Sequence, residues 1–183
     1  MAYPNTTQIQ NARLSLRSHF LNIAIADGYW NDFTQELAEQ VFYGLATSAI
    51  DHSIPRIYIS PVLRTMDPTS MRRADYNRES PGDGPFVGIV GKQRIEFDCV
   101  GVSEIDGQDA YLTRERLAQD METVLGLWAP VTSIAPVLDQ LLITEMSFGA
   151  DEIQREAGIT TDGVCRLRVA IDWTPLDEGG PLP

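Results

Sequence analysis

The stretch Val164-Cys165-Arg166-Leu167-Arg168-Val169-Ala170-Ile171-Asp172-Trp173 alternates between apolar and polar side chains. Its apolar positions are Cys165, Leu167, Val169, Ile171 and Trp173, and its polar positions are Arg166, Arg168 and Asp172. A period of two residues is typical of a β-strand that buries one face and exposes the other. Because the apolar face must pack on another layer, this stretch predicts a sheet lying against helices.

Other strands are predicted beside it. Residues 94–102 place Ile95, Phe97 and Cys99 on one side and Glu96 and Asp98 on the other, as one arm of a hairpin with 86–90 that turns near Gly91-Lys92. If 94–102 lies beside 164–173, these acids can oppose Arg166 and Arg168, each pair contributing about 0.2–1 kcal/mol. Residues 141–148 form a further strand, and 54–62, with a proline near each end, form one near an edge.

Two amphipathic helices complete the predicted core. The first runs from a cap at Thr6 or Thr7 to Gly28, with this apolar stripe: Ile9, Leu14, Leu16, Phe20, Leu21, Ile23 and Ile25. The second covers 113–128 and is capped by Thr113, with Leu112 and Leu117 at the positions of a hydrophobic staple. Its stripe is formed by Leu117, Met121, Val124, Leu125 and Trp128. Trp128 and Trp173 are expected to be core residues.

These elements predict an α/β protein of the α+β kind, with a mostly antiparallel sheet packed against two main helices. A chain of 183 residues suits one domain. We expect this domain to span 7–173, between a flexible N-terminus at 1–6 and a flexible C-terminal tail at 174–183. Residues 34–50 fit either a helix or a short strand. Irregular connections are expected at 129–140 and 149–163.

Residues 63–85 form a long predicted loop without periodicity, interrupted by Pro68, Pro81 and Pro85. A loop of this length inside a compact domain is usually functional or mobile. It contains four of the fourteen basic residues of the chain, namely Arg64, Arg72, Arg73 and Arg78. The loop is therefore either simply solvated or an arm that contacts an acidic surface on a neighbouring subunit.

The chain as a whole is acidic, with a formal charge of −12 and a pI near 4.4. This charge repels duplex DNA and excludes sequence-independent DNA binding. An acidic protein can still enclose DNA that has to slide past it. No basic and apolar leader opens the chain, and no run of about 18 apolar residues occurs, so neither export nor a membrane span is expected.

Residues suited to catalysis are present only in patterns that composition explains. The glycine-rich stretch 82–88 precedes a predicted strand instead of opening a helix, and Gly91-Lys92 lacks the other residues of a P-loop. His19 and His52 have no metal ligand at a recognised spacing, and Cys99 and Cys165 are expected to be buried free thiols. The acid pairs Glu96/Asp98 and Asp151/Glu152 could serve acid–base chemistry, but the chain contains 26 acids. We therefore predict no enzyme activity, no cofactor and no metal site.

A family resemblance appears in the first third of the chain. A long first helix ending in Ala26-Asp27-Gly28-Tyr29-Trp30-Asn31-Asp32, then Val41-Phe42-Tyr43-Gly44, then Ile54-Pro55-Arg56-Ile57-Tyr58-Ile59, resembles the tail terminator proteins of long-tailed bacteriophages. The later order of hairpin, helix and two strands is also similar to that family. The resemblance covers roughly residues 7–173 and favours a strand at Val41–Tyr43.

The resemblance implies an α/β subunit that closes into a six-membered ring at the head-proximal end of the tail tube. The expected partners are other copies of the chain, the tail tube protein and the head connector or stopper, with DNA passing through unbound and no membrane contact. The expected location is the tail or neck of the virion, assembled in the host cytoplasm. The alternatives are another neck component, a small acidic cytosolic enzyme using Glu96, Asp98 or Asp172, and an interaction module of another kind.

Overall fold

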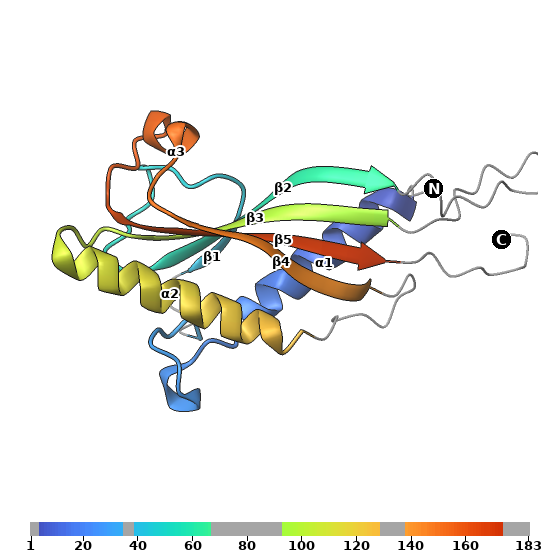
Figure 1. The fold of residues 1–183 in the computed structure, drawn as a ribbon, viewed down its shortest axis with the longest axis horizontal. Coiled ribbons are helices and arrows are strands. Elements are labelled where there is room, and N and C mark those ends of the chain that lie inside the picture. Colours follow the sequence, from blue (N-terminus) through green and yellow to red (C-terminus); the bar gives the residue numbers. More distant parts are fainter. Residues whose placement is uncertain (1–3, 35–38, 67–92, 129–137, 174–183) are drawn as a thin grey trace, which may run out of the picture.

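The computed structural model describes residues 4–34, 39–66, 93–128 and 138–173, which form one five-stranded sheet with helices (Figure 1). The elements follow in the order α1 (Pro4–Phe20), η1 (Ile25–Asp27), β1 (Val41–Tyr43), β2 (Arg56–Met66), β3 (Gln93–Ser103), α2 (Gln108–Gly126), β4 (Leu138–Phe148), α3 (Glu152–Glu156) and β5 (Gly163–Trp173). The predicted fold class, a mostly antiparallel sheet packed on helices, is confirmed.

The strands lie side by side in the order β1-β2-β3-β5-β4. β1 is parallel to β2, and every other neighbouring pair is antiparallel. β5, the strand with the clearest alternation, is thus surrounded by β3 and β4. In register, Cys99 lies opposite Leu167 and Asp98 opposite Arg168.

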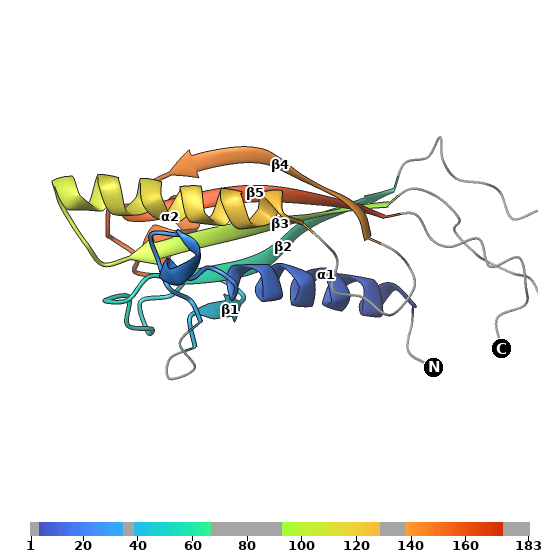
Figure 2. The same ribbon diagram turned by 90° about the horizontal axis from the view of Figure 1, so that it is seen from below.

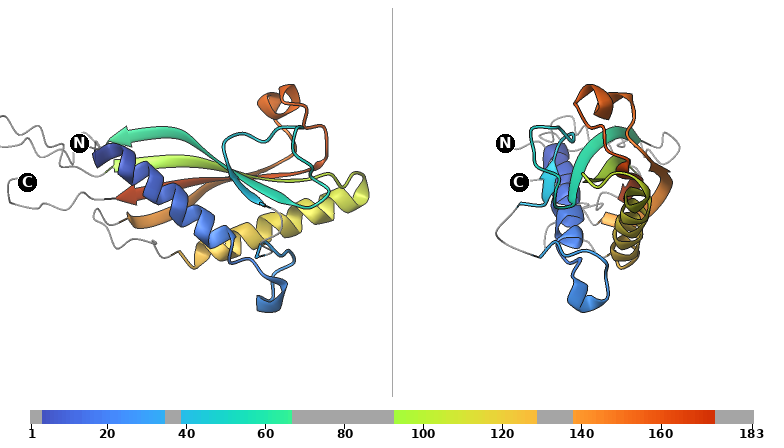
Figure 3. Two further views of the ribbon diagram at one scale, coloured as in Figure 1. Left: turned by 180° about the vertical axis from the view of Figure 1, so that it is seen from behind. Right: turned by 90° about the vertical axis from the view of Figure 1, so that its left-hand side faces the viewer.

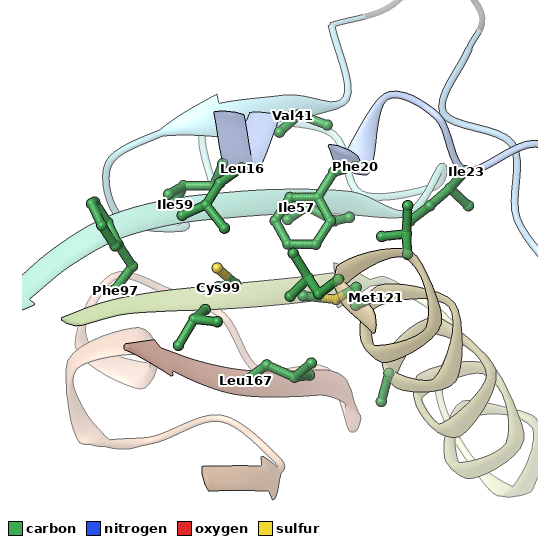
Figure 4. Packing of buried hydrophobic residues seen from close by; sticks show 14 of the residues in the cluster. Leu16, Phe20, Ile23, Val41, Ile57, Ile59, Phe97, Cys99, Met121 and Leu167 are labelled. Carbon is green, nitrogen blue, oxygen red and sulfur yellow. The ribbon is translucent and has the colours of Figure 1, made fainter. Parts of the chain in front are cut away.

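The main core lies between the sheet and the helices α1 and α2 (Figures 2 and 4). The apolar residues of β5 that face this core, Cys165, Leu167, Val169 and Ile171, are fully buried. Leu16 and Phe20 from α1 and Met121 from α2 pack on the same side of the sheet. Burying side chains of this size contributes about 1.5–3 kcal/mol each, which explains why the alternation of β5 predicts the layer arrangement.

A smaller apolar cluster covers only part of the opposite face. Tyr58, Val100, Val102 and Val164 pack there with Ala46 and Ile159 from the connecting segments. The polar residues of β3 and β5, such as Asp98 and Arg168, lie along the rest of the same face.

The first helix differs from its prediction at both ends. It begins at Pro4, a residue favoured in the first turn of a helix, so it starts ahead of the expected Thr6 or Thr7 cap and within residues 1–6. It ends at Phe20, and three residues later the Ile23 carbonyl accepts a hydrogen bond from the Phe33 N–H at 2.8 Å. Gly28, with φ of 92°, instead ends the short helix η1. Leu14 and Ile25 are exposed, so they do not belong to the buried stripe.

The second helix starts earlier than predicted. Gly107, with φ of 80°, is its N-cap, and Thr113 lies inside the helix. Leu112 is exposed and forms no hydrophobic staple. Trp128 follows the helix, half-buried, and its ring stacks on His19 at 4.8 Å between centroids. The side chain of Trp173 lies outside the described residues.

Three further predictions concern the strands. Val41–Tyr43 is a strand, as the resemblance favoured, and the strand after Ile54 lies next to the short edge strand β1. β2 continues to Met66, however, so residues 63–66 are not loop; a register shift between Pro61 and Leu63 lets the strand pass the proline. Residues 86–90 and the C-terminal tail lie outside the described residues. The predicted hairpin of 86–90 with 94–102 is wrong, however, because β3 is paired along both sides, with β2 and with β5. The connection 149–163 contains the short helix α3, which was not predicted.

Candidate interaction surfaces

The four arginines singled out in the sequence are only partly described by the structure. Arg64 lies on β2, in register with Ile95 of β3, and not in a loop. Arg72, Arg73 and Arg78 lie outside the described residues. Their contact with a neighbouring subunit therefore stays a prediction.

Two of the acids considered for catalysis, Asp98 and Asp172, are held by arginines on the face of the sheet opposite the main core. The Arg168 Nε–H donates to Asp98 Oδ1 at 3.0 Å, and its Nη2 donates to Asp98 Oδ2 at 3.4 Å. Arg94 forms the same two-pronged contact with Asp172, at 2.7 Å and 3.0 Å. The carboxylates of Asp98 and Asp172 raise the pKa of Arg168 and Arg94, chiefly through these hydrogen bonds. Such pairing orients both carboxylates toward the sheet and stabilises strand pairing.

One of the two predicted cross-strand pairs is correct. Asp98 opposes Arg168, but Glu96 opposes Ala170, and Arg166 opposes Val100. The pair Arg94–Asp172 was missed.

Arg166 instead contacts Asp151, which caps helix α3. The Asp151 carboxylate accepts from the Gln154 N–H at 2.8 Å, and the Gln154 side chain accepts from the Asp151 N–H at 3.0 Å. Burial alone would raise the pKa of Asp151, but the hydrogen bonds from Gln154 and Arg166 outweigh it and lower that pKa. Asp151 therefore fixes the connection between β4 and β5.

Both histidines have protein partners. His52 is buried, and its Nε2 lies 2.7 Å from the Tyr58 hydroxyl. His19 Nδ1 lies 2.7 Å from the Ser15 carbonyl oxygen. Within the described residues, no three His, Cys, Asp or Glu side chains are grouped to hold a metal ion. Cys99 and Cys165 are buried free thiols, and burial raises the pKa of Cys165 to about 12.

Two surface hollows lie away from Glu96, Asp98 and Asp172, three of the acids considered for catalysis. One lies between the ends of α1 and α2 and is lined by His19, Asp27 and Leu127 among others. The second is open and lies over α3. Neither is lined by Glu96, Asp98 or Asp172.

The loop after α1 presents an exposed tryptophan. Both carboxylate oxygens of Asp120 on α2 lie 3.1 Å from the Trp30 backbone nitrogen. Trp30 is 54% exposed, and the Arg116 guanidinium lies 4.3 Å from the centroid of its ring. The sequence showed two aromatics in this turn, but no local signal pointed to Asp120, which lies far away along the chain.

At one edge of the sheet, β4 presents what we call the β4 surface: Leu141, Ile143, Met146 and Phe148 of β4, with Tyr111 of α2. The four β4 residues lie in register with core residues of β5, yet Met146 and Phe148 are 39% and 45% exposed. The Arg114 guanidinium lies 4.3 Å from the Tyr111 ring centroid and 5.3 Å from that of Phe148, which joins the helix to the strand. Glu145, also on β4, is exposed and lies 3.5 Å from Arg168.

At the opposite edge lies what we call the β1 surface: Arg13, Leu14 and Arg17 of α1, with Tyr43 of β1 and the following Leu45. Leu14, Tyr43 and Leu45 are exposed. The Arg13 guanidinium lies 5.7 Å from the Tyr43 ring centroid, and the Arg17 Nε–H donates to the Val41 carbonyl oxygen at 3.4 Å. Burial raises the pKa of Tyr43, and the charges of Arg17 and Arg13 oppose that rise.

Comparison with known proteins adds no family. No protein-family model matches the sequence, and no curated protein matches it. In the part of the chain that the structure describes, no helix is both long and apolar enough to cross a bilayer.

Proposed function

We propose that this protein is a tail terminator protein of a long-tailed bacteriophage, a virion structural protein. Six subunits close into a ring at the head-proximal end of the tail tube, stop its growth and join the tail to the head connector. The subunit is assembled in the host cytoplasm, and it neither binds a cofactor nor catalyses a reaction.

The observation that supports this proposal most strongly concerns the segments that resemble the family. The first helix, Val41–Tyr43 and the strand after Ile54 are separate in sequence but form one packing unit. β1 pairs with β2, and Leu16 and Phe20 of α1 pack against Val41 and Ile57 (Figure 4).

The charge of the chain is compatible with this role. A ring around passing DNA benefits from a net charge of −12, because attraction to the phosphates would hold the DNA back. The arginines Arg64, Arg72, Arg73 and Arg78 would then clasp the acidic surface of the next subunit or the connector.

A second candidate, a connector or stopper of the same neck, differs from the first only in its position in the particle. The third, a small acidic enzyme, has less support. Asp98 and Asp172 are engaged by arginines, and neither hollow lies over them.

The proposal is tested first by the genes beside this one: tail tube and tape-measure genes are expected. At the bench, purified protein at high concentration is imaged by negative-stain electron microscopy and weighed by native mass spectrometry. Closed six-fold rings with a central hole wide enough for duplex DNA are expected.

A second experiment tests whether rings form only on the end of a tail tube. Tubes assembled from the neighbouring tail tube protein are mixed with this protein, and density at one tube end together with arrested elongation is expected. Tubes that keep growing with bare ends, from a protein that forms no rings, would exclude the proposal.

A further inference from the structure

A hollow lies where the C-terminal ends of α1 and α2 come together, beside the turn that contains η1 (Figure 3). Its volume is about 530 Å³, within the range of about 300–1,000 Å³ that is usual for ligand pockets. Residues from three segments line it, among them Ser18 and His19 of α1, Asp27 of η1, Tyr29 after η1, and Leu127 after α2. The proposed tail function assigns this hollow no role.

The turn beside the hollow is fixed in place by α2. The buried carboxylate of Asp120 accepts hydrogen bonds from the backbone N–H groups of Trp30 and Asn31. Val124 and Leu127, which line the hollow, follow Asp120 by four and seven residues, so all three lie on one side of the helix. The hollow is therefore preformed, and a ligand does not have to order this turn when it binds.

The electrostatics of the hollow favours a cation. Two helices end beside it, and the C-terminal end of a helix carries roughly half an elementary negative charge. The last turn of α2 contains no basic residue, and Arg17 in the last turn of α1 is engaged by Glu39 and the Val41 carbonyl. Asp27 is exposed, and it forms no ion pair within the described residues. The hollow thus combines a full negative charge with two partial ones.

The histidine in the hollow adds an acceptor to this site. His19 Nδ1 lies 2.7 Å from the Ser15 carbonyl oxygen, which can only accept, so Nδ1 is the nitrogen that carries the proton. In the neutral ring, Nε2 is then an acceptor. Its ring is held in position by stacking on Trp128.

Apolar and aromatic side chains surround the negative site. Ile25, Trp30 and Leu127 are 61%, 54% and 70% exposed, and Tyr29 lines the hollow. Guanidinium groups pack well on aromatic rings, as Arg116 does on the ring of Trp30. Exposed apolar side chains around a preformed hollow are typical of a contact with another protein, because a free inorganic cation gains nothing from them.

We propose that this hollow is a docking site for an arginine side chain of a partner protein, carried on a segment with apolar neighbours. The guanidinium binds the Asp27 carboxylate and the carbonyl ends of the two helices, and its stem packs along Tyr29. The apolar neighbours cover Trp30 and Leu127. Arginine suits the site better than lysine, because its five donors can be shared among several acceptors. The site does not depend on the proposed tail function.

Peptide titration tests the site. The probes are the peptide acetyl-Leu-Arg-Leu-amide and the same peptide with citrulline, which has nearly the shape of arginine but no charge. Binding to the full chain is followed in ¹H–¹⁵N NMR spectra. The arginine peptide should shift the signals of Asn22, Asp27 and Leu127 and of the Trp30 indole. The citrulline peptide should bind about tenfold more weakly, because it lacks the charge-assisted contacts.

A matched pair of variants separates the hollow from the overall charge. Asp27→Asn should lower the affinity for the arginine peptide about tenfold, and thermal unfolding should stay unchanged because Asp27 is exposed. Glu122→Gln removes the same charge from an exposed position of α2 that does not line the hollow, and it should leave binding unchanged. Leu127→Ser should weaken both peptides alike. Equal losses in Asp27→Asn and Glu122→Gln would mean that the net charge of −12 attracts the peptide, and would overturn the proposal.

Two further outcomes would also overturn it. One is equal affinity for the arginine and citrulline peptides, or signal shifts spread over the whole surface. The other is tighter binding of putrescine, a free diamine without apolar neighbours, than of the arginine peptide. The tail function fails or stands separately: a chain that caps no tail tubes but binds the arginine peptide at Asp27 keeps this site and loses that function.

Discussion

Asp120 on α2 binds Asn31 twice: its Oδ2 accepts the Asn31 N–H at 2.8 Å and the Asn31 side-chain Nδ2–H at 2.7 Å. Together with the bonds to the Trp30 backbone, one carboxylate that is 2% exposed fixes the whole turn after η1. The turn therefore depends on α2, although the two segments are far apart in sequence.

Replacing Asp120 with alanine should lower the free energy of unfolding by about 2–3 kcal/mol, because several donors lose a charged acceptor at a buried site. Urea denaturation followed by tryptophan fluorescence measures this loss. Glu122→Ala, an exposed change on the same helix, should stay within about 0.5 kcal/mol of the wild type. Equal effects of the two changes would show that Asp120 has no special role.

Gly101 of β3 lies close to Leu117 of α2. A Cβ at this position would lie 2.6 Å from Leu117 Cδ2 and 2.8 Å from Cys165 Sγ. Gly101→Ala should therefore destabilise the protein by about 1–3 kcal/mol through overpacking. Gly126→Ala, where a Cβ meets nothing within 4 Å, is the matched control and should cost nothing measurable in thermal unfolding. A neutral Gly101→Ala would mean that the two layers have room to separate.

The alternation of apolar residues predicted β3 and β5 well, since burying one face of a strand requires it. The register of these two strands also determines a cross-strand pair that the sequence analysis missed, Arg94 with Asp172. Antiparallel partners keep a constant sum of residue numbers, so Asp98 opposite Arg168 already places Arg94 opposite Asp172 and excludes Glu96 from Arg166.

Helix ends were less predictable, because local signals compete with distant contacts. Gly28 and Thr113 are good stop and cap residues in isolation, yet the chain leaves α1 at Phe20 and enters α2 after Gly107. The exposure of the β4 surface could not be predicted from the sequence either, since β4 has the composition of a core strand. Only the sheet order shows that it lies at an edge.

The buried His52 should make the protein less stable in mild acid. Burial lowers the pKa of His52 below its ordinary value of 6.5, so the unfolded chain binds this proton more readily than the folded one. Stability should therefore fall as the pH drops below about 6.5, by at most about 1.4 kcal/mol per pH unit.

Urea denaturation between pH 5 and pH 8 tests this dependence. His52→Gln removes the titrating group and should flatten the curve in this range. Tyr58→Phe removes only the hydroxyl partner, and since burial is the main cause of the shift, the dependence should persist. An unchanged pH dependence in His52→Gln would assign the effect to another group.

The arginines of the 63–85 region are expected to act in assembly and not in folding. Changing Arg64, Arg72, Arg73 and Arg78 together to serine should leave the thermal unfolding of the monomer nearly unchanged and weaken ring formation in native mass spectrometry. Arg64→Ser alone tests the β2 position separately. Unimpaired assembly of the fourfold variant would remove these residues from the mechanism.

The pair Asp98–Arg168 should contribute modestly to stability, because both side chains remain partly exposed. A double-mutant cycle with alanine at each position should give a coupling of about 0.5–1 kcal/mol, near the upper end for surface pairs because the contact is two-pronged. The cycle for Glu145 and Arg168 is the comparison, since Glu145 is more exposed and its contact is a single one of 3.5 Å, and it should give less. Raising the salt from about 0.1 M to 1 M shortens the screening length from about 10 Å to 3 Å and should lower both couplings. A coupling energy that does not change with salt concentration, or one larger for Glu145–Arg168 than for Asp98–Arg168, would contradict the contact geometry of these pairs.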